Sequence, residues 1–127
     1  MSSLPRPAAA PCKSCPYRCD VPSGVWDATE YAKLSGYDGE MWRQHQALFM
    51  CHQQDGCLCA GWLACHGSDD LLALRLRPVH GSAYGYISPV PVFASGAEAA
   101  AHGMADIRRP QARAQAVMAR LSRKVSA

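Results

Sequence analysis

The stretch PCKSCPYRC, residues 11–19, places three cysteines close together and a proline directly after the second. Such spacing indicates disulfides, a redox pair or part of a metal site. The chain has seven cysteines, an odd number that cannot pair completely, and structural disulfides are rare in the reducing cytoplasm that we expect for it. A redox Cys-x-x-C would follow a strand and begin a helix, whereas this one follows a tail-like segment. Metal binding is therefore the favoured interpretation.

The composition is typical of one globular domain, with 127 residues of which 49% are hydrophobic and 18% charged. No apolar run is long enough to cross a bilayer, and the N-terminus lacks the apolar core of a signal peptide. We therefore expect a disordered tail over residues 1–11 and a single metal-binding domain over residues 12–127. The predicted location is the cytoplasm, without membrane association.

A metal centre of this kind needs about four ligands, so the other half must come from a second segment. The sequence CHQQDGCLCAGWLACHG, residues 51–67, supplies four more cysteines and two histidines. A helix is predicted from residue 60 to 66, which places Cys59 at its N-terminus, where the helix dipole favours a thiolate. Cys59 is thus a favoured ligand.

The remaining pattern predicts short helices joined by irregular loops. A capping box at 27–30 predicts a helix over 28–34, followed by a turn over 35–39 and a helix over 40–47. Each His-Gly pair, at 66–67, 80–81 and 102–103, is interpreted as a helix end. The fold class expected is mostly α, a small single domain of short helices and irregular loops organised around a four-cysteine metal site.

Four motifs together resemble a family of small uncharacterised proteins from actinobacteria and their phages. They are PCKSCPYR at 11–18, SGVW at 23–26, CHQ at 51–53 and CAGWL at 59–63, and the likeness extends to SGAEA at 95–99. The resemblance implies a ligand set of Cys12, Cys15, Cys51 and Cys59. It leaves Cys19, Cys57 and Cys65 outside the shared motif, without an assigned role.

A fainter similarity links the chain to WhiB-like iron-sulfur proteins, which have four cysteines and a turn like Gly24-Val25-Trp26. In those proteins the turn follows the last cysteine, whereas here it lies between the two pairs. The similarity therefore suggests a class of cofactor, and no DNA-binding residue is transferred from it.

Four thiolates suit either a 4Fe-4S cluster or a tetrahedral zinc ion. Pro16 after a cysteine and the small residues Ala60 and Gly61 beside Cys59 favour the iron-sulfur cluster, and zinc is the alternative. His52 and Trp62 are expected to lie around the site without binding the metal. The alternatives are that His52 is itself a ligand and that Trp62 only packs one helix against another.

The positive charge is concentrated at the C-terminus, because residues 67–127 have eight Lys or Arg against four Asp or Glu. A basic helix is predicted at about 110–124, with Ala114, Val117, Met118 and Leu121 as its apolar stripe. Arg109, Arg113, Arg120 and Lys124 are the candidate nucleic-acid contacts, and a solvated helix face is the alternative.

No nucleotide-binding glycine loop and no catalytic Ser/His/Asp arrangement is present in the sequence. We therefore expect a binding or regulatory module rather than an enzyme. Its cluster would support the fold and sense redox state, and its partner would be a protein or a nucleic acid. The alternative is a zinc-stabilised interaction domain.

Overall fold

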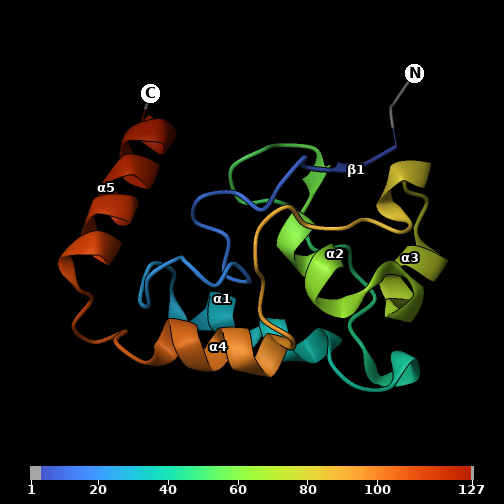
Figure 1. The fold of residues 1–127 in the computed structure, drawn as a ribbon, viewed down its shortest axis with the longest axis horizontal. Helices are drawn as coiled ribbons and strands as arrows, with labels where there is room; N and C mark the ends of the chain where they lie inside the picture. Colours follow the sequence, from blue (N-terminus) through green and yellow to red (C-terminus); the bar gives the residue numbers. More distant parts are fainter. Residues whose placement is uncertain (1–3, 127) are drawn as a thin grey trace.

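The computed structural model describes the backbone of residues 4–126 and the side chains of residues 4–121. Within these residues the regular secondary structure is mainly helical, as predicted, with two very short strands, and loops make up much of the rest (Figure 1). The α-helices are α1 (Ala28–Ala32), α2 (Ala60–His66), α3 (Leu72–Leu76), α4 (Gly96–Met104) and α5 (Ala112–Ser126). The strands are β1 (Arg6–Pro7) and β2 (Cys57–Leu58), and the 3-10 helices are η1 (Leu34–Tyr37), η2 (Met41–Arg43), η3 (Ser68–Asp70) and η4 (Gly81–Ala83).

The N-terminal segment is part of the folded domain from residue 4 onward, in contrast to the predicted tail. Strand β1 pairs in parallel with β2, and the Ala8 N–H donates to the Leu58 carbonyl at 3.2 Å. Ala8 is buried, because a small apolar side chain fits beneath the second cysteine segment. The first three residues of the predicted tail lie outside the described residues.

The first predicted helix is present but short. Asp27 caps α1 by accepting a hydrogen bond from the Thr29 N–H. The chain then continues as η1 where a turn was predicted, and the helix predicted over 40–47 is reduced to η2. The cause is Gln44, which has an extended backbone and is used as a buried bridge: its side-chain amide donates to the carbonyls of Gly39 and Asp70.

Of the three predicted His-Gly helix ends, only the first is confirmed. Gly67 ends α2 with a φ of 79°, a conformation that glycine adopts readily. His80 instead begins a helix, because its side chain accepts from the Ser82 N–H at the start of η4. Gly103 lies inside α4, where a Cβ would stand 2.1 Å from the Tyr31 ring, so this glycine allows close packing.

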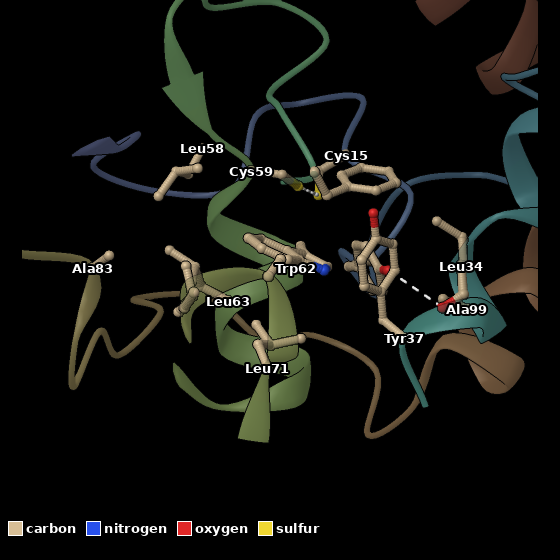
Figure 2. Packing of buried hydrophobic residues seen from close by; sticks show 14 of the residues in the cluster. Cys15, Leu34, Tyr37, Leu58, Cys59, Trp62, Leu63, Leu71, Ala83 and Ala99 are labelled. Carbon is tan, nitrogen blue, oxygen red and sulfur yellow. Dashed lines mark hydrogen bonds between the residues drawn. The ribbon is translucent and has the colours of Figure 1, made fainter. Parts of the chain in front are cut away.

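The core is built around Trp62, which is completely buried (Figure 2). The rings of Tyr37 and Phe49 pack on it at centroid distances of 5.4 and 6.4 Å. Leu58, Leu63 and Leu71 surround it. Helix α2 thus lies at the centre of the domain, with one cysteine at its first turn.

Helix α4 closes one side of the domain by packing on α1 and η1 (Figure 1). Its first turn approaches so closely that a Cβ on Gly96 would lie 1.9 Å from the Leu34 carbonyl oxygen. Ser95 caps the helix by accepting from the Glu98 N–H, and the Asp38 carboxylate accepts from the N–H of Gly96 at 2.7 Å.

Helix α5 docks on the segment that follows the first cysteine cluster. Its predicted apolar stripe is confirmed: Ala114 and Val117 pack against Val21 and Val25, with Met118 and Leu121 at the margin. Arg113 and Arg120 lie at the border of this contact, where the Arg113 guanidinium donates to the Asp20 carbonyl at 3.1 Å. None of the helices in residues 4–126 combines the length and the apolar character that a bilayer crossing requires.

Candidate metal centre

The first cysteine loop is a pair of tight turns. The Cys15 N–H donates to the Cys12 carbonyl at 3.0 Å, and the Arg18 N–H donates to the Cys15 carbonyl at 3.1 Å. Ser14, between the two cysteines, is buried; its carbonyl accepts from the Trp26 indole N–H at 2.7 Å and its hydroxyl accepts from Gln53. Trp26, from the predicted SGVW turn, thus fixes the loop.

The second cysteine loop is closed by backbone hydrogen bonds. The Cys51 N–H donates to the Cys57 carbonyl at 2.8 Å, and the Cys59 N–H donates to the Phe49 carbonyl at 2.9 Å. Gly56, with a φ of 78°, makes the turn between them. Cys59 is the N-cap residue of α2, so the prediction that the helix begins just after it is confirmed.

The four cysteines of the predicted ligand set are brought together. The sulfur atoms of Cys15 and Cys59 lie 3.7 Å apart (Figure 2). The Cys12 side chain lies close enough to Cys15 and Cys51 for both neighbours to shift its pKa. The thiols are therefore neighbours in the order Cys51, Cys12, Cys15, Cys59, and we call these four residues the thiol cluster.

The neighbouring thiols help to raise the pKa values of Cys12, Cys15 and Cys51. The hydrogen bond with Cys15 is the main reason that the pKa of Cys12 is raised, and the hydrogen bond with Cys12 raises the pKa of Cys51 in the same way. For Cys15, the contact with Cys12 lowers the pKa, but the contact with Cys59 and burial together raise it further. A bound metal cation would hold these groups as thiolates, because its positive charge offsets the repulsion between neighbouring negative sulfur atoms.

Backbone N–H groups already point at two of the sulfur atoms. Tyr17 donates to Cys15, whereas Gln53 and Gln54 donate to Cys51, and each of these hydrogen bonds lowers the thiol pKa. Hydrogen bonds to the sulfur ligands are one of the means by which proteins stabilise and tune metal-thiolate centres. The donor set therefore fits a thiolate centre chemically.

The first turn of α2 is shaped to admit a sulfur atom. A Cβ on Gly61 would lie 2.5 Å from the Cys15 sulfur and 2.9 Å from the Tyr17 Cβ, both well inside van der Waals contact. Only glycine leaves this room without a shift of the neighbouring atoms. The close approach indicates that the position of the Cys15 sulfur is part of the packing of the domain.

The arrangement differs from a ready single-ion site. Across residues 4–126, no three His, Cys, Asp or Glu side chains converge so that they could hold one metal ion. Four thiolates around zinc, at about 2.3 Å each, would all stand roughly 3.8 Å apart. The sulfur atoms of Cys15 and Cys59 have this separation, but among the described residues no third metal-binding side chain converges with them.

The two residues predicted around the metal lie close to the cysteine loops in sequence and take part in ring packing. The His52 Nε2–H donates to the Glu30 carboxylate at 2.9 Å, and the imidazole ring packs on Trp26 at a centroid distance of 4.5 Å. Trp62 is buried in the core, and its indole N–H has no hydrogen-bond partner among the described residues. Its ring edge contacts Tyr37.

The three cysteines outside the ligand set occupy different environments. Cys19 is exposed, and Cys57 is partly buried on β2. Cys65 lies on α2, where burial raises its pKa to about 12. A thiol with such a pKa stays protonated and unreactive at neutral pH.

Sequence analysis did not identify Ser14, Trp26 and Gln53 as supports of the cysteine loops. A serine between two cysteines and a glutamine after another carry no distinctive signal. Trp26 belongs to the SGVW motif, but only the fold shows that its indole N–H donates to the first cysteine loop.

The basic residues predicted as nucleic-acid contacts are not all together. Arg113 and Arg120 lie on one side of α5, beside Lys13 and Arg18 of the first cysteine segment. Arg109 lines a separate hollow with residues 104–108. The side chain of Lys124 lies outside the described residues.

The fold and the site define a small, mostly α-helical domain with two cysteine loops whose thiols meet beside a central helix. The chain belongs to a family of unknown function, DUF6283, whose model matches residues 7–122. The match covers both cysteine loops and most of α5. Comparison with curated proteins gave no match, and neither did comparison with solved structures.

Proposed function

We propose that this protein is a small cytoplasmic iron-sulfur protein that binds a 4Fe-4S cluster through Cys12, Cys15, Cys51 and Cys59. The cluster stabilises the fold and responds to oxygen or redox state. The protein as a whole acts as a regulatory or binding module. The observation that carries the proposal is the grouping of four thiols from two separate loops, with the sulfur atoms of Cys15 and Cys59 3.7 Å apart across the loops.

Pro16 directly after Cys15 and the small residues at the start of α2 support a cluster in preference to one ion. Each thiolate of a 4Fe-4S centre binds a different iron, so the ligands stand further apart than around a single metal. The sulfur atoms of Cys15 and Cys59, which lie 3.7 Å apart, would therefore separate when the cluster binds. The room at Gly61 lets the Cys15 sulfur approach the backbone of α2, beside which the cofactor would sit.

A zinc-stabilised interaction domain is the second candidate. Its specific support is the 3.7 Å separation of the Cys15 and Cys59 sulfur atoms, which equals the edge of a tetrahedral zinc-thiolate site. The other two thiols would have to move inward to complete the coordination. The two candidates differ in colour, in metal and in oxygen sensitivity.

Purification without oxygen, followed by metal and sulfide analysis, distinguishes the candidates. We expect brown protein with broad visible absorption, about four irons and four acid-labile sulfides per chain, and bleaching in air. Colourless protein with one equivalent of zinc would establish the alternative. Folded protein that retains no metal would refute both.

Single Cys→Ser variants test the ligand set, and matched controls come from the same chain. Serine at position 12, 15, 51 or 59 should abolish or strongly reduce metal retention, because metal binding and folding are coupled in such domains. Cys19→Ser, at an exposed position, should retain the full metal content. Loss of metal in Cys57→Ser together with full retention in Cys59→Ser would show that the second pair is wrongly assigned.

A further inference from the structure

A basic groove runs between the first cysteine loop and α5. Its main part has a volume of about 340 Å³ and is lined by Lys13, Arg18, Arg113 and Arg120 together with Asp20 and small or apolar residues. A second hollow of about 150 Å³ shares Lys13 and Arg120 with it and extends toward Gln53 and Leu121. We call this continuous surface the basic groove.

The charge in the basic groove is only partly neutralised. Asp20 pairs with Arg18, with Oδ1 and Nε 2.6 Å apart. Among the described side chains, no carboxylate pairs with Lys13, Arg113 or Arg120. Arg113 is nevertheless held in place, because its guanidinium donates to the Asp20 carbonyl at 3.1 Å. Three positive charges thus remain available to a ligand.

We propose that the basic groove binds the phosphate backbone of a nucleic acid, an inference that goes beyond the iron-sulfur function. Arg113 and Arg120 are two helical turns apart, about 10 Å along α5, and Lys13 faces them from the cysteine loop. A row of cations at this spacing matches a repeating polyanion. None of the described side chains that line the groove is aromatic, so the contacts are with phosphates and carry little sequence preference.

The packing of α5 argues against a membrane surface as the ligand. An amphipathic helix that binds lipid inserts a free apolar face beneath the headgroups. On α5 that face is used inside the protein, where Ala114 is fully buried and Val117 is 8% exposed against Val21 and Val25. Four of the eight residues that line the main part of the groove are Lys or Arg, so the groove offers mainly positive charge.

Binding of a short labelled DNA duplex and of the corresponding single strand, followed by fluorescence anisotropy at several salt concentrations, tests the proposal. Three neutralised phosphates predict a slope near −2.7 for the logarithm of duplex affinity against that of salt concentration. Lys13→Gln, Arg113→Gln and Arg120→Gln should each weaken binding several-fold and reduce the slope by about 0.9. Arg109→Gln removes the same charge from outside the groove and should leave both values unchanged.

The proposal is overturned if the triple Gln variant, shown by circular dichroism to be folded, binds DNA as tightly as the wild type. It is also overturned if anionic phospholipid vesicles bind as tightly as DNA and lose that binding in the same variant. The metal content, read from absorption, is a separate measurement. Colourless protein with the predicted DNA binding would refute the iron-sulfur function and support the groove.

Discussion

Replacing Gly61 by alanine adds one methyl group at the point where α2 meets the Cys15 sulfur. The new Cβ would lie 2.5 Å from that sulfur and 2.9 Å from the Tyr17 Cβ. Ordinary carbon contacts are about 3.5–4.0 Å, so both neighbours would have to retreat by roughly 1 Å. Cys15 is 1% exposed and Tyr17 is completely buried, which leaves little room for the shift.

Two opposing effects set the magnitude for Gly61→Ala. Alanine in place of glycine within a helix favours folding by up to about 1 kcal/mol. Overpacking of a well-filled core costs about 1–3 kcal/mol. We therefore expect the free energy of unfolding of the metal-free protein to fall by about 1–2 kcal/mol. The metal content should fall by more than this loss of stability explains, since the displaced sulfur is a proposed ligand.

Urea denaturation measures the first quantity, and iron or zinc analysis of protein purified without oxygen measures the second. Gly81→Ala is the matched control, because a Cβ there meets no atom within 4 Å. It should leave the metal content unchanged. Full metal retention in Gly61→Ala, with stability equal to or above that of the wild type, would refute the reasoning that places the Cys15 sulfur against α2.

Three further predictions concern the fold. Burial lowers the pKa of His66, so as the pH falls the imidazole is protonated in the unfolded chain before it is protonated in the folded protein. The free energy of unfolding should therefore decrease below about pH 6.5. Denaturation at several pH values should show a less steep decrease for His66→Gln. Gln44→Ala removes a buried bridge of three hydrogen bonds and should cost about 3 kcal/mol in urea denaturation, whereas Gln46→Ala, at an exposed position, should cost almost nothing. Gly103→Ala places a Cβ 2.1 Å from the Tyr31 ring and should lower the melting temperature despite better helix propensity; an unchanged melting temperature would contradict the close packing of α4.

Local signals predicted the elements that depend on neighbouring residues. The cap at Asp27 and the start of α2 after Cys59 follow from side chains that bond to the backbone within one turn. The apolar stripe of α5 was also predictable, because its period matches the helix. These features need no knowledge of the rest of the chain.

Elements that depend on distant contacts were not predictable in the same way. The helix expected over 40–47 is replaced by η2 because Gln44 bridges to Asp70, far along the chain. The sequence predicts that Gly103 ends a helix. The structure shows that a glycine is needed there because the Tyr31 ring packs against its backbone. A glycine signal alone does not distinguish a left-handed turn from a close approach.

The candidate site shows the same division. The grouping of Cys12, Cys15, Cys51 and Cys59 was expected from the resemblance of the motifs, and their thiols do meet. The partnership of Lys13 with Arg113 and Arg120 was not expected, because it depends on where α5 docks. Sequence analysis identified the cations of the helix but not the loop that faces them.

The pairing of β1 has a practical consequence for shortening this protein. Residues 5–9 donate or accept hydrogen bonds with three separate segments: the Pro5 carbonyl with His80, Ala8 with Leu58, and the Ala9 carbonyl with the Tyr86 hydroxyl. A fragment that began at the first cysteine would lose all three connections at once. The smallest unit that can be studied therefore begins before the cysteine motif, and a fusion partner is better attached at the opposite end.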